Sequence, residues 1–339
     1  MSVTVSRTCA IELAVMTITL MLPRRRDAGI ERSACQNRGV QVAMTMPIME
    51  PDLDAEVLGD WAKAIDDGPF SSLCWGERMA FDNPETLTLM GALAAWTDRV
   101  RLVTTVMVPQ LHDPVMLAKA LATGDMLSGG RLTVGLGIGG RVEDYRAVGA
   151  DPANQTMRGM ADSVAVMKRV WDGKKITESV LPVGPAPVQP GGPPLLVGTI
   201  GPKTLRSAAA WADGLAGTTL DLDVAKQNEL FDVARHAWSD AGRAKPHLAT
   251  SFWFALGSVD EARRQVHRHL RRYMNWIPVE YIDAMAPTTG FAGSEDDLVA
   301  VLREFEAVGT DEIQLIPTSS DLEQVERAGD LVEAMQGGG

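Results

Sequence analysis

The sequence predicts an α/β protein that folds as a single (β/α)8 TIM barrel. From residue 40 onward, short runs of β-branched residues alternate with longer amphipathic stretches, a pattern typical of repeated βα units and a parallel sheet. About eight such units can be counted, and 339 residues suit one barrel that carries insertions. We therefore predict one barrel domain over residues 39–336.

Each expected strand is followed by an expected helix. The strands are expected at residues 40–46, 71–75, 100–108, 132–137, 195–199, 214–218, 248–254 and 312–317. The helices are expected at residues 53–65, 84–96, 114–127, 155–171, 202–211, 224–241, 295–308 and 322–335. Asp223, Ser294 and Asp321 stand where N-caps belong, because their side chains can accept hydrogen bonds from free N–H groups of the first helical turn.

Two stretches interrupt this alternation, and both are predicted to be loops. Residues 181–194 are rich in Pro and Gly, and residues 260–291 form a long insertion after the seventh strand. An insertion at that place either shapes the ligand mouth of the barrel or extends its outer shell. Its arginines could steer an anionic ligand, but solvation of a helix surface is the favoured interpretation. These arginines are Arg263, Arg264, Arg268, Arg271 and Arg272.

Composition excludes several classes of partner. A formal net charge of -12 without a clustered basic face repels a phosphate backbone, so no nucleic-acid partner is expected. Cys9, Cys35 and Cys74 have neither disulfide-like nor metal-ligand spacing, which predicts free thiols in a reducing, cytoplasmic compartment. His267 and His269 are two residues apart on an expected helix and do not face each other, so no metal site is predicted.

The first 38 residues differ from the rest of the chain. Residues 11–22 form an apolar run that Glu12 interrupts and three arginines follow, which reverses the charge order of a secretory signal peptide. The run is also too short to cross a bilayer about 30 Å thick. We therefore expect a dispensable N-terminal extension over residues 1–38 and no association with a membrane.

Two glycine-rich corners follow expected strands and are candidate ligand sites. The first consists of Gly137, Ile138 and Gly139, and the second of Gly198, Thr199, Ile200 and Gly201. Glycine lets backbone N–H groups approach a ligand, although it also simply permits tight turns. Pro202 suits the first position of the helix after the second corner, and helix N-termini bind anions, so a cofactor phosphate is expected there.

Residues 100–149, VRLVTTVMVPQLHDPVMLAKALATGDMLSGGRLTVGLGIGGRVEDYRAVG, resemble the luciferase-like monooxygenases, a family with flavin-dependent and coenzyme F420-dependent members. Residues 193–214 and 291–317 agree with this resemblance, which extends over about residues 40–332. It implies a luciferase-like barrel that binds F420, or alternatively FMN, at the C-terminal ends of its strands. The ring would lie against Thr105 and Val106, joined by a cis peptide bond, and the phosphate near Thr199, Ile200 and Gly201.

The chain departs from the family where F420-dependent members commonly have Asp-His, because Glu77 and Arg78 stand there instead. Glu77 could exchange protons if burial raised its pKa, whereas Arg78 stays charged and would bind an anion or order Glu77. We take both as candidate catalytic residues, with a rim salt bridge as the alternative. His112 precedes Asp113, the expected cap of the next helix, and a surface position is favoured over a role at the ring edge.

The resemblance implies an oxidoreductase that moves a hydride between F420 and a small organic substrate. An FMN-dependent monooxygenase and a non-catalytic barrel that only binds F420 or flavin remain alternatives, since a fold alone does not establish catalysis. By analogy with the family, the protein is expected to be a homodimer. Trp75, Met107 and part of the long insertion are expected to form the walls of the substrate pocket.

Overall fold

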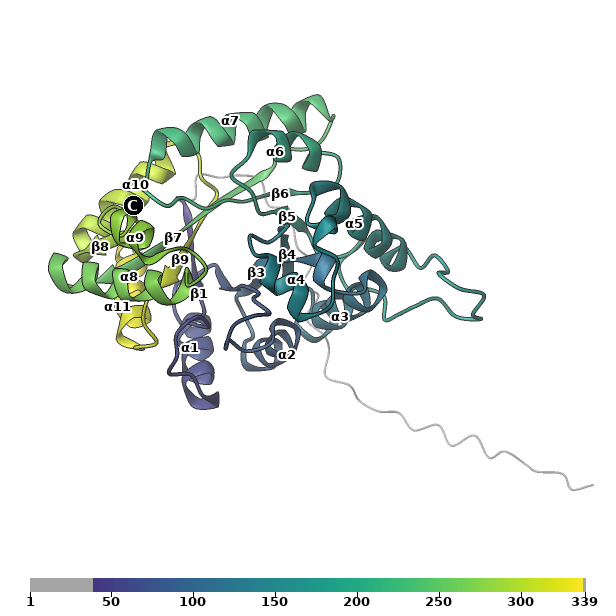
Figure 1. Ribbon diagram of the computed structural model, residues 1–339, viewed down its shortest axis with the longest axis horizontal. Helices are drawn as coiled ribbons and strands as arrows, with labels where there is room; N and C mark the ends of the chain where they lie inside the picture. Colours follow the sequence, from purple (N-terminus) through teal and green to yellow (C-terminus); the bar gives the residue numbers. More distant parts are fainter. Residues whose placement is uncertain (1–38, 338–339) are drawn as a thin grey trace, which may run out of the picture. The chain divides into compact units, whose positions relative to one another are not determined.

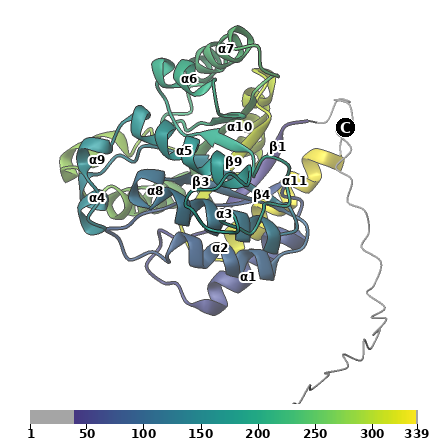
Figure 2. The same cartoon turned by 90° about the vertical axis from the view of Figure 1, so that its right-hand side faces the viewer.

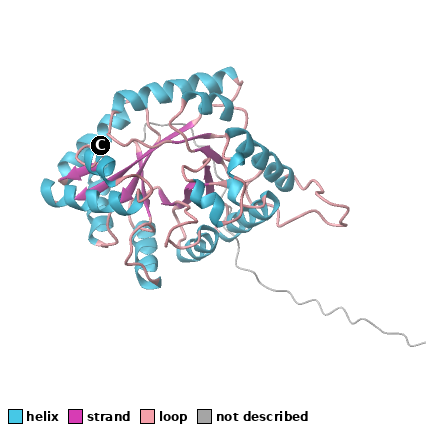
Figure 3. Cartoon of the chain, in the orientation of Figure 1, coloured by secondary structure: helices cyan, strands magenta, loops and turns pink. Residues whose placement is uncertain are grey.

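Eight parallel strands close into a barrel in the computed structural model, which describes residues 39–337 (Figures 1 and 3). The barrel strands are β1 (Gln41–Thr45), β2 (Ser72–Trp75), β3 (Arg101–Met107), β4 (Leu132–Leu136), β5 (Leu195–Val197), β6 (Gly214–Ala216), β7 (His247–Leu256) and β9 (Glu312–Pro317). Strands β1 to β7 pair in chain order, and β9 closes the ring between β7 and β1. The predicted fold class is confirmed.

Helices surround this barrel on its outside, as Figure 3 shows by colour. The helices that follow barrel strands are α1 (Ala55–Asp67), α2 (Thr86–Trp96), α3 (Pro114–Leu127), α5 (Met157–Trp171), α6 (Pro202–Ala208), α7 (Val224–Asp240), α10 (Glu295–Ala307) and α11 (Glu323–Gly337). The caps expected at Asp113, Asp223 and Ser294 are present, and each side chain accepts backbone N–H groups of its helix. An unexpected short helix, α4 (Val142–Ala147), follows the first glycine corner.

The prediction of a loop at residues 260–291 is wrong. This insertion contains α8 (Val259–Tyr273), α9 (Val279–Met285) and the short strand β8 (Phe291–Gly293), which pairs with the C-terminal end of β7. Helix α8 is strongly amphipathic, and its apolar face packs in a separate small core with Trp253 and Ile282. Figure 2 shows α4, α8 and α9 at the same end of the barrel. The insertion therefore forms an ordered wall at the mouth.

Four of the five arginines of the insertion donate hydrogen bonds to other groups of the protein, so for these four the interpretation that they only solvate a helix is wrong. Arg268 donates to Glu50 at 2.9 Å, and Arg272 donates to Asp82 at 2.6 Å. Arg263 donates to the carbonyl of Thr289 within the insertion at 2.6 Å. The contacts of Arg268 and Arg272 attach α8 to the loops after β1 and β2.

Some expectations concern residues outside the described range. The prediction that residues 1–38 form a dispensable extension stays a prediction, and Cys9 and Cys35 lie in the same segment. Cys74 in β2 is a buried free thiol, as expected. Within residues 39–337, no helix is both long and apolar enough to cross a membrane.

The carboxylate of Glu312 joins three strands at the N-terminal end of the barrel. Its Oε1 accepts hydrogen bonds from Ser71 and Ser72, both at 2.6 Å, and from Arg101 at 2.7 Å. Burial alone would raise the pKa of Glu312, but bonding and charge from His247, Arg101 and Ser71 outweigh burial and hold it well below the ordinary value. The ionised carboxylate therefore stabilises the N-terminal end of the barrel, which is opposite the ligand mouth.

Replacing Glu312 should therefore destabilise the barrel. We expect Glu312→Gln to lower the free energy of unfolding by about 2–3 kcal/mol, because Arg101 and the serines lose a charged acceptor. The folded pKa is depressed, so this stabilisation is present above the ordinary value of 4.5 and is lost as the pH falls towards the folded pKa. Urea unfolding between about pH 2 and pH 8 measures both effects. Glu333→Gln on the exposed side of α11 is the control, and equal loss in the two variants would contradict the assignment.

Candidate functional site

The peptide bond between Thr105 and Val106 is cis, as the resemblance implied. It lies near the C-terminal end of β3, where the pairing register with β4 shifts between Thr104 and Met107. Thr105 and Val106 are half-buried, whereas their neighbours Thr104 and Met107 are fully buried. The partly exposed pair thus lies near the C-terminal end of β3, where the ring of a cofactor was expected.

The glycines of both corners have no Cβ atom, and the side chain of Val106 occupies the space that such atoms would need. A Cβ atom at Gly137 would lie 2.8 Å from Cγ2 of Val106, and one at Gly198 would lie 2.7 Å from its Cγ1. A Cβ atom at Gly135 would also meet Val106, at 3.2 Å, and the carbonyl oxygen of Thr104 at only 2.2 Å. Glycine at positions 137 and 198 is thus required for packing, in addition to any approach of a ligand.

A cavity of about 60 Å³ opens beside Thr105 at the C-terminal ends of β1, β2, β3, β7 and β9. Thr45, Gly76, Thr105, Trp253, His269 and Tyr273 are among its lining residues. The insertion contributes His269 and Tyr273, so it does shape the mouth. Trp75 and Met107 were wrongly expected in the pocket wall, because both are fully buried in the main core.

Two polar atoms in the lining of this cavity are buried without a partner. Within residues 39–337, neither Oγ1 of Thr45 nor Nε2 of His269 has a hydrogen-bond partner. The other ring nitrogen of His269, Nδ1, lies 2.6 Å from Oε1 of Glu50. Sequence reasoning missed His269, although a histidine on the apolar face of an arginine-rich amphipathic helix was a usable signal.

Glu77 and His112 form a buried pair. The carboxylate of Glu77 accepts the N–H of Val108 at 2.8 Å, and its other oxygen lies 2.8 Å from Nε2 of His112. The His112 side chain is only 13% exposed, so the favoured surface interpretation is wrong. Burial lowers the pKa of His112, but the bond to Glu77 and its charge outweigh this effect and raise it. Since both oxygens of Glu77 are engaged, any proton that it exchanges would pass through His112.

Arg78 points into a group of aromatic side chains. Its guanidinium lies 4.2 Å from the ring centre of Phe81 and 5.1 Å from that of Trp276, and it donates to the carbonyl of Tyr273 at 2.9 Å. Burial and the charge of Arg141 lower the pKa of Arg78. Among residues 39–337, no hydrogen bond joins Arg78 to Glu77. Arg78 thus connects the loop after β2 to the insertion through cation–π contacts.

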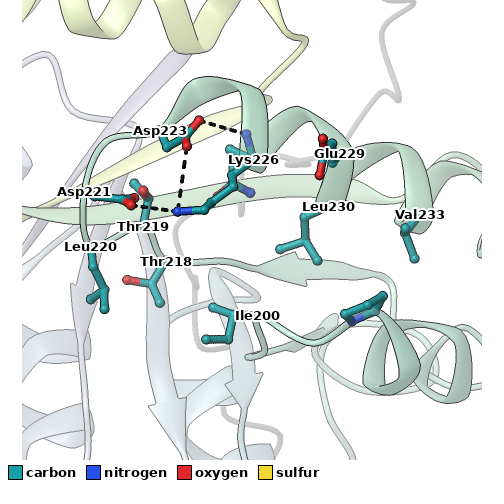
Figure 4. A pocket seen from close by; sticks show the side chains of 12 residues that line it. Ile200, Thr218, Thr219, Leu220, Asp221, Asp223, Lys226, Glu229, Leu230 and Val233 are labelled. Atoms are coloured by element: carbon teal, nitrogen blue, oxygen red, sulfur yellow. Dashed lines mark hydrogen bonds and ion pairs between the residues drawn. The ribbon is translucent and has the colours of Figure 1, made fainter.

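The second glycine corner borders a larger pocket of about 440 Å³ between β6 and α7 (Figure 4). Ile200 is 68% exposed at this corner, and the N–H of Gly201 donates to Oγ1 of Thr199 at 2.9 Å. Lys226 lies 2.8 Å from Asp221 and 3.7 Å from Asp223, so its charge is already paired. A phosphate at the corner would therefore depend on backbone N–H groups.

In the part of the chain that the structure describes, no group of three or more His, Cys, Asp or Glu side chains could hold a metal ion.

A model of the luciferase-like monooxygenase family matches residues 33–331. The chain belongs to this family.

Relatives of this luciferase-like protein include F420-dependent enzymes. An uncharacterised protein of Mycobacterium tuberculosis is 35% identical over 162 residues, a match that spans 45% of this chain and only 56% of the relative. The 5,10-methylenetetrahydromethanopterin reductase of Archaeoglobus fulgidus is 27% identical over 75% of both chains. An F420-dependent glucose-6-phosphate dehydrogenase of Nakamurella multipartita is 28% identical over 58% of this chain and 66% of its own.

Solved structures share the fold of this luciferase-like protein. An F420-dependent secondary alcohol dehydrogenase, solved with an F420–acetone adduct, superimposes with a TM-score of 0.74 at 16% identity, covering 88% of this chain and 99% of its own. A monooxygenase from Streptomyces bottropensis gives a TM-score of 0.69 at 21% identity, covering 87% of this chain and 98% of its own. At these identities the likeness establishes the barrel alone.

The packing of Val106 against Gly137 predicts a rescue experiment. Gly137→Ala should destabilise the protein by about 1–3 kcal/mol, because the added methyl overpacks the mouth. Val106→Ala should restore most of that loss, since it removes both γ-methyl groups of Val106. Thermal or urea unfolding of the double-mutant cycle measures the coupling.

Gly135→Ala serves as the control for this cycle, because its new methyl would meet the backbone oxygen of Thr104. Truncating Val106 should therefore not rescue Gly135→Ala. Equal rescue at positions 135 and 137 would contradict the packing argument.

The buried pair predicts the titration of His112. Its pKa should lie above the ordinary 6.5, and Glu77→Gln should lower it because the imidazolium loses its carboxylate partner. The stabilisation from this pair is full below pH 6.5 and is lost as the pH rises through the folded pKa. Ring NMR of histidine measures both pKa values, with exposed His236 as the internal control. An unchanged His112 titration in Glu77→Gln would refute the pairing.

Proposed function

We propose that this protein is an oxidoreductase that uses coenzyme F420 to move a hydride to or from a small organic substrate. The observation that carries the proposal is the half-buried Thr105–Val106 pair at the C-terminal end of β3, of which Thr105 lines a cavity at the ends of the strands. The relative named as an F420-dependent glucose-6-phosphate dehydrogenase supports F420 over other cofactors. When bound, F420 would supply the hydride chemistry, while the protein supplies orientation and electrostatics.

The residues at the mouth suit a planar ring with an anionic tail. Thr105 and Val106 would lie against the ring, and the corner of Gly137, Ile138 and Gly139 would lie along its edge. The corner of Gly198, Thr199, Ile200 and Gly201 would hold the phosphate through the N–H groups of Thr199 and Ile200, because those of Gly198 and Gly201 already donate to the carbonyl of Leu136 and to Oγ1 of Thr199. The fit is supported by the unpartnered Oγ1 of Thr45 within the described residues, a hydrogen-bonding group that faces the same cavity.

Glu77 and Arg78 have separate roles in this proposal. Glu77 would favour the protonated form of His112, whose pKa it raises, and the pair would hold or move a proton near the edge of the ring. Arg78 would keep the loop after β2 against the insertion and so position Glu77 from a distance. An FMN-dependent monooxygenase is the second candidate, favoured by the description of the matching family.

Parallel titrations with F420 and FMN test the proposal. The full chain should bind F420 at least about tenfold more tightly than FMN, a difference of about 1.4 kcal/mol, as measured by fluorescence. Preference for FMN would favour the monooxygenase, and binding without turnover of any alcohol, aldehyde or ketone would favour a non-catalytic barrel. Binding of neither cofactor would overturn the assignment.

The proposed phosphate corner predicts the effect of an added charge. Ile200→Asp should weaken F420 binding roughly tenfold through repulsion between like charges. Because Ile200 is 68% exposed, the substitution should leave the unfolding midpoint unchanged. Val180→Asp, at a site 87% exposed, adds the same charge elsewhere and should bind F420 like the unmodified protein. Equal affinity of both variants would remove the phosphate from this corner.

A further inference from the structure

The imidazole of His269 lies at the cavity beside Thr105 and has no role in the function proposed above. His269 is 2% exposed and lies on α8 of the insertion, and its ring lines the same cavity as Thr105 and Gly76. Its ring stacks on that of Tyr273 at 5.9 Å between centres and lies 6.2 Å from that of Trp253. The aromatic neighbours fix the plane of the imidazole, so its free nitrogen has a defined position.

Glu50 fixes which nitrogen of His269 is free. Oε1 of Glu50 lies 2.6 Å from Nδ1 of His269, and Oε2 accepts from Arg268 at 2.9 Å. Glu50 itself is 3% exposed and lies in the loop after β1. A carboxylate that holds Nδ1 leaves Nε2 to exchange a proton, the arrangement in which a histidine base is oriented by a third group.

Two unpartnered polar atoms in one cavity indicate a ligand that presents oxygen. Within residues 39–337, Nε2 of His269 and Oγ1 of Thr45 both lack a hydrogen-bond partner, and each such buried atom is costly. The remaining lining includes the apolar side chains of Met46, Ile48 and Ile316. The volume of about 60 Å³ holds more than one water molecule or one small functional group.

We infer that His269 exchanges a proton with the reacting oxygen of the substrate, and that the substrate is a small molecule with a hydroxyl or carbonyl group. Thr45 provides the second hydrogen bond to that oxygen, and Glu50 is a positioning residue. In the oxidising direction, the C–H bond yields a hydride to the cofactor, the O–H proton passes to Nε2, and a C=O bond forms. Reduction of a carbonyl reverses each transfer. This inference rests on the proposed function for the hydride acceptor, but its ligand site does not.

Ring NMR of histidine-labelled protein tests the ligand site without turnover. Acetone and 2-propanol are the probes for the full chain without cofactor, and acetone alone is used with oxidised F420. Each probe should move the Nε2 resonance of His269, identified by its loss in His269→Asn, and Thr45→Val should weaken the response. His267 is on the same helix as His269, but its Nε2 lies 2.6 Å from Asp283 of α9, so it should not respond. No response of His269 to either probe would overturn the inference, because the cavity would then hold only water.

Kinetics of the F420-loaded protein with a panel of small alcohols and ketones test the proton transfer. His269→Asn should lower kcat by roughly 100-fold to 10,000-fold, the range for loss of a general acid–base group. Glu50→Gln should lower kcat with little change in KM and should shift the His269 ring resonances, which a purely structural residue would not do. His267→Asn is the matched control two residues away and should retain full activity. Equal losses in the two histidine variants would refute the assignment.

Cofactor binding separates failure of this inference from failure of the proposed function. If the unmodified protein binds no F420 but acetone still moves Nε2 of His269, the proposed function fails and the ligand site stands. If F420 binds and His269 does not respond to the probes, the inference alone fails. His269→Asn should bind F420 within about twofold of the unmodified protein, and loss of binding would make His269 a structural part of the wall.

Discussion

Space around the side chain of Val106 constrains the whole mouth of the barrel. Val106 fits only because Gly137 and Gly198, on the ends of two neighbouring strands, have no Cβ atom to meet it. Protein interiors are close-packed, so a single methyl group at either position would displace Val106 or the strand that bears it. The position of Thr105, and with it one wall of the cavity, depends on this packing.

The two ends of the barrel differ in what surrounds their buried polar groups. At the N-terminal end, Oε1 of Glu312 is bonded by two serines and an arginine and so joins three strands, while its Oε2 lies 3.6 Å from His247 without a hydrogen-bond partner in the described chain. At the C-terminal end, His269 and Thr45 each keep one polar atom without a partner in the described chain. Hydrogen bonds to a buried charge contribute to stability, whereas an unpartnered polar atom that lines a cavity is available to a ligand. This division agrees with the general separation of stability and activity in barrels.

The insertion after β7 places His269 at the mouth of the barrel and is held there by ion pairs. Arg268 and Arg272 bind carboxylates of the loops after β1 and β2, so α8 is held over the strand ends. Arg78 and Arg141 both contact the ring of Trp276 in the insertion, and the guanidinium of Arg141 lies 3.9 Å from its ring centre. The same helix face that packs on the small core therefore carries His269 to Glu50. The loops after β1 and β2 and the insertion together place His269 and its partner Glu50 at this cavity.

The sequence alone determined the barrel, its eight strands with their helices, the caps at Asp113, Asp223 and Ser294, and the family. These features follow from local periodicity, capping and motifs, which depend on residues close together in the chain. The tertiary structure decided the pairing of Glu77 with His112, separated by 35 residues, and of Glu50 with His269, separated by 219. It also showed that the insertion predicted as a loop is an ordered wall. The sequence did not predict α8, because its many arginines obscured the apolar face of the helix. Contacts between distant residues depend on how strands and loops assemble around one core, and no local pattern records them.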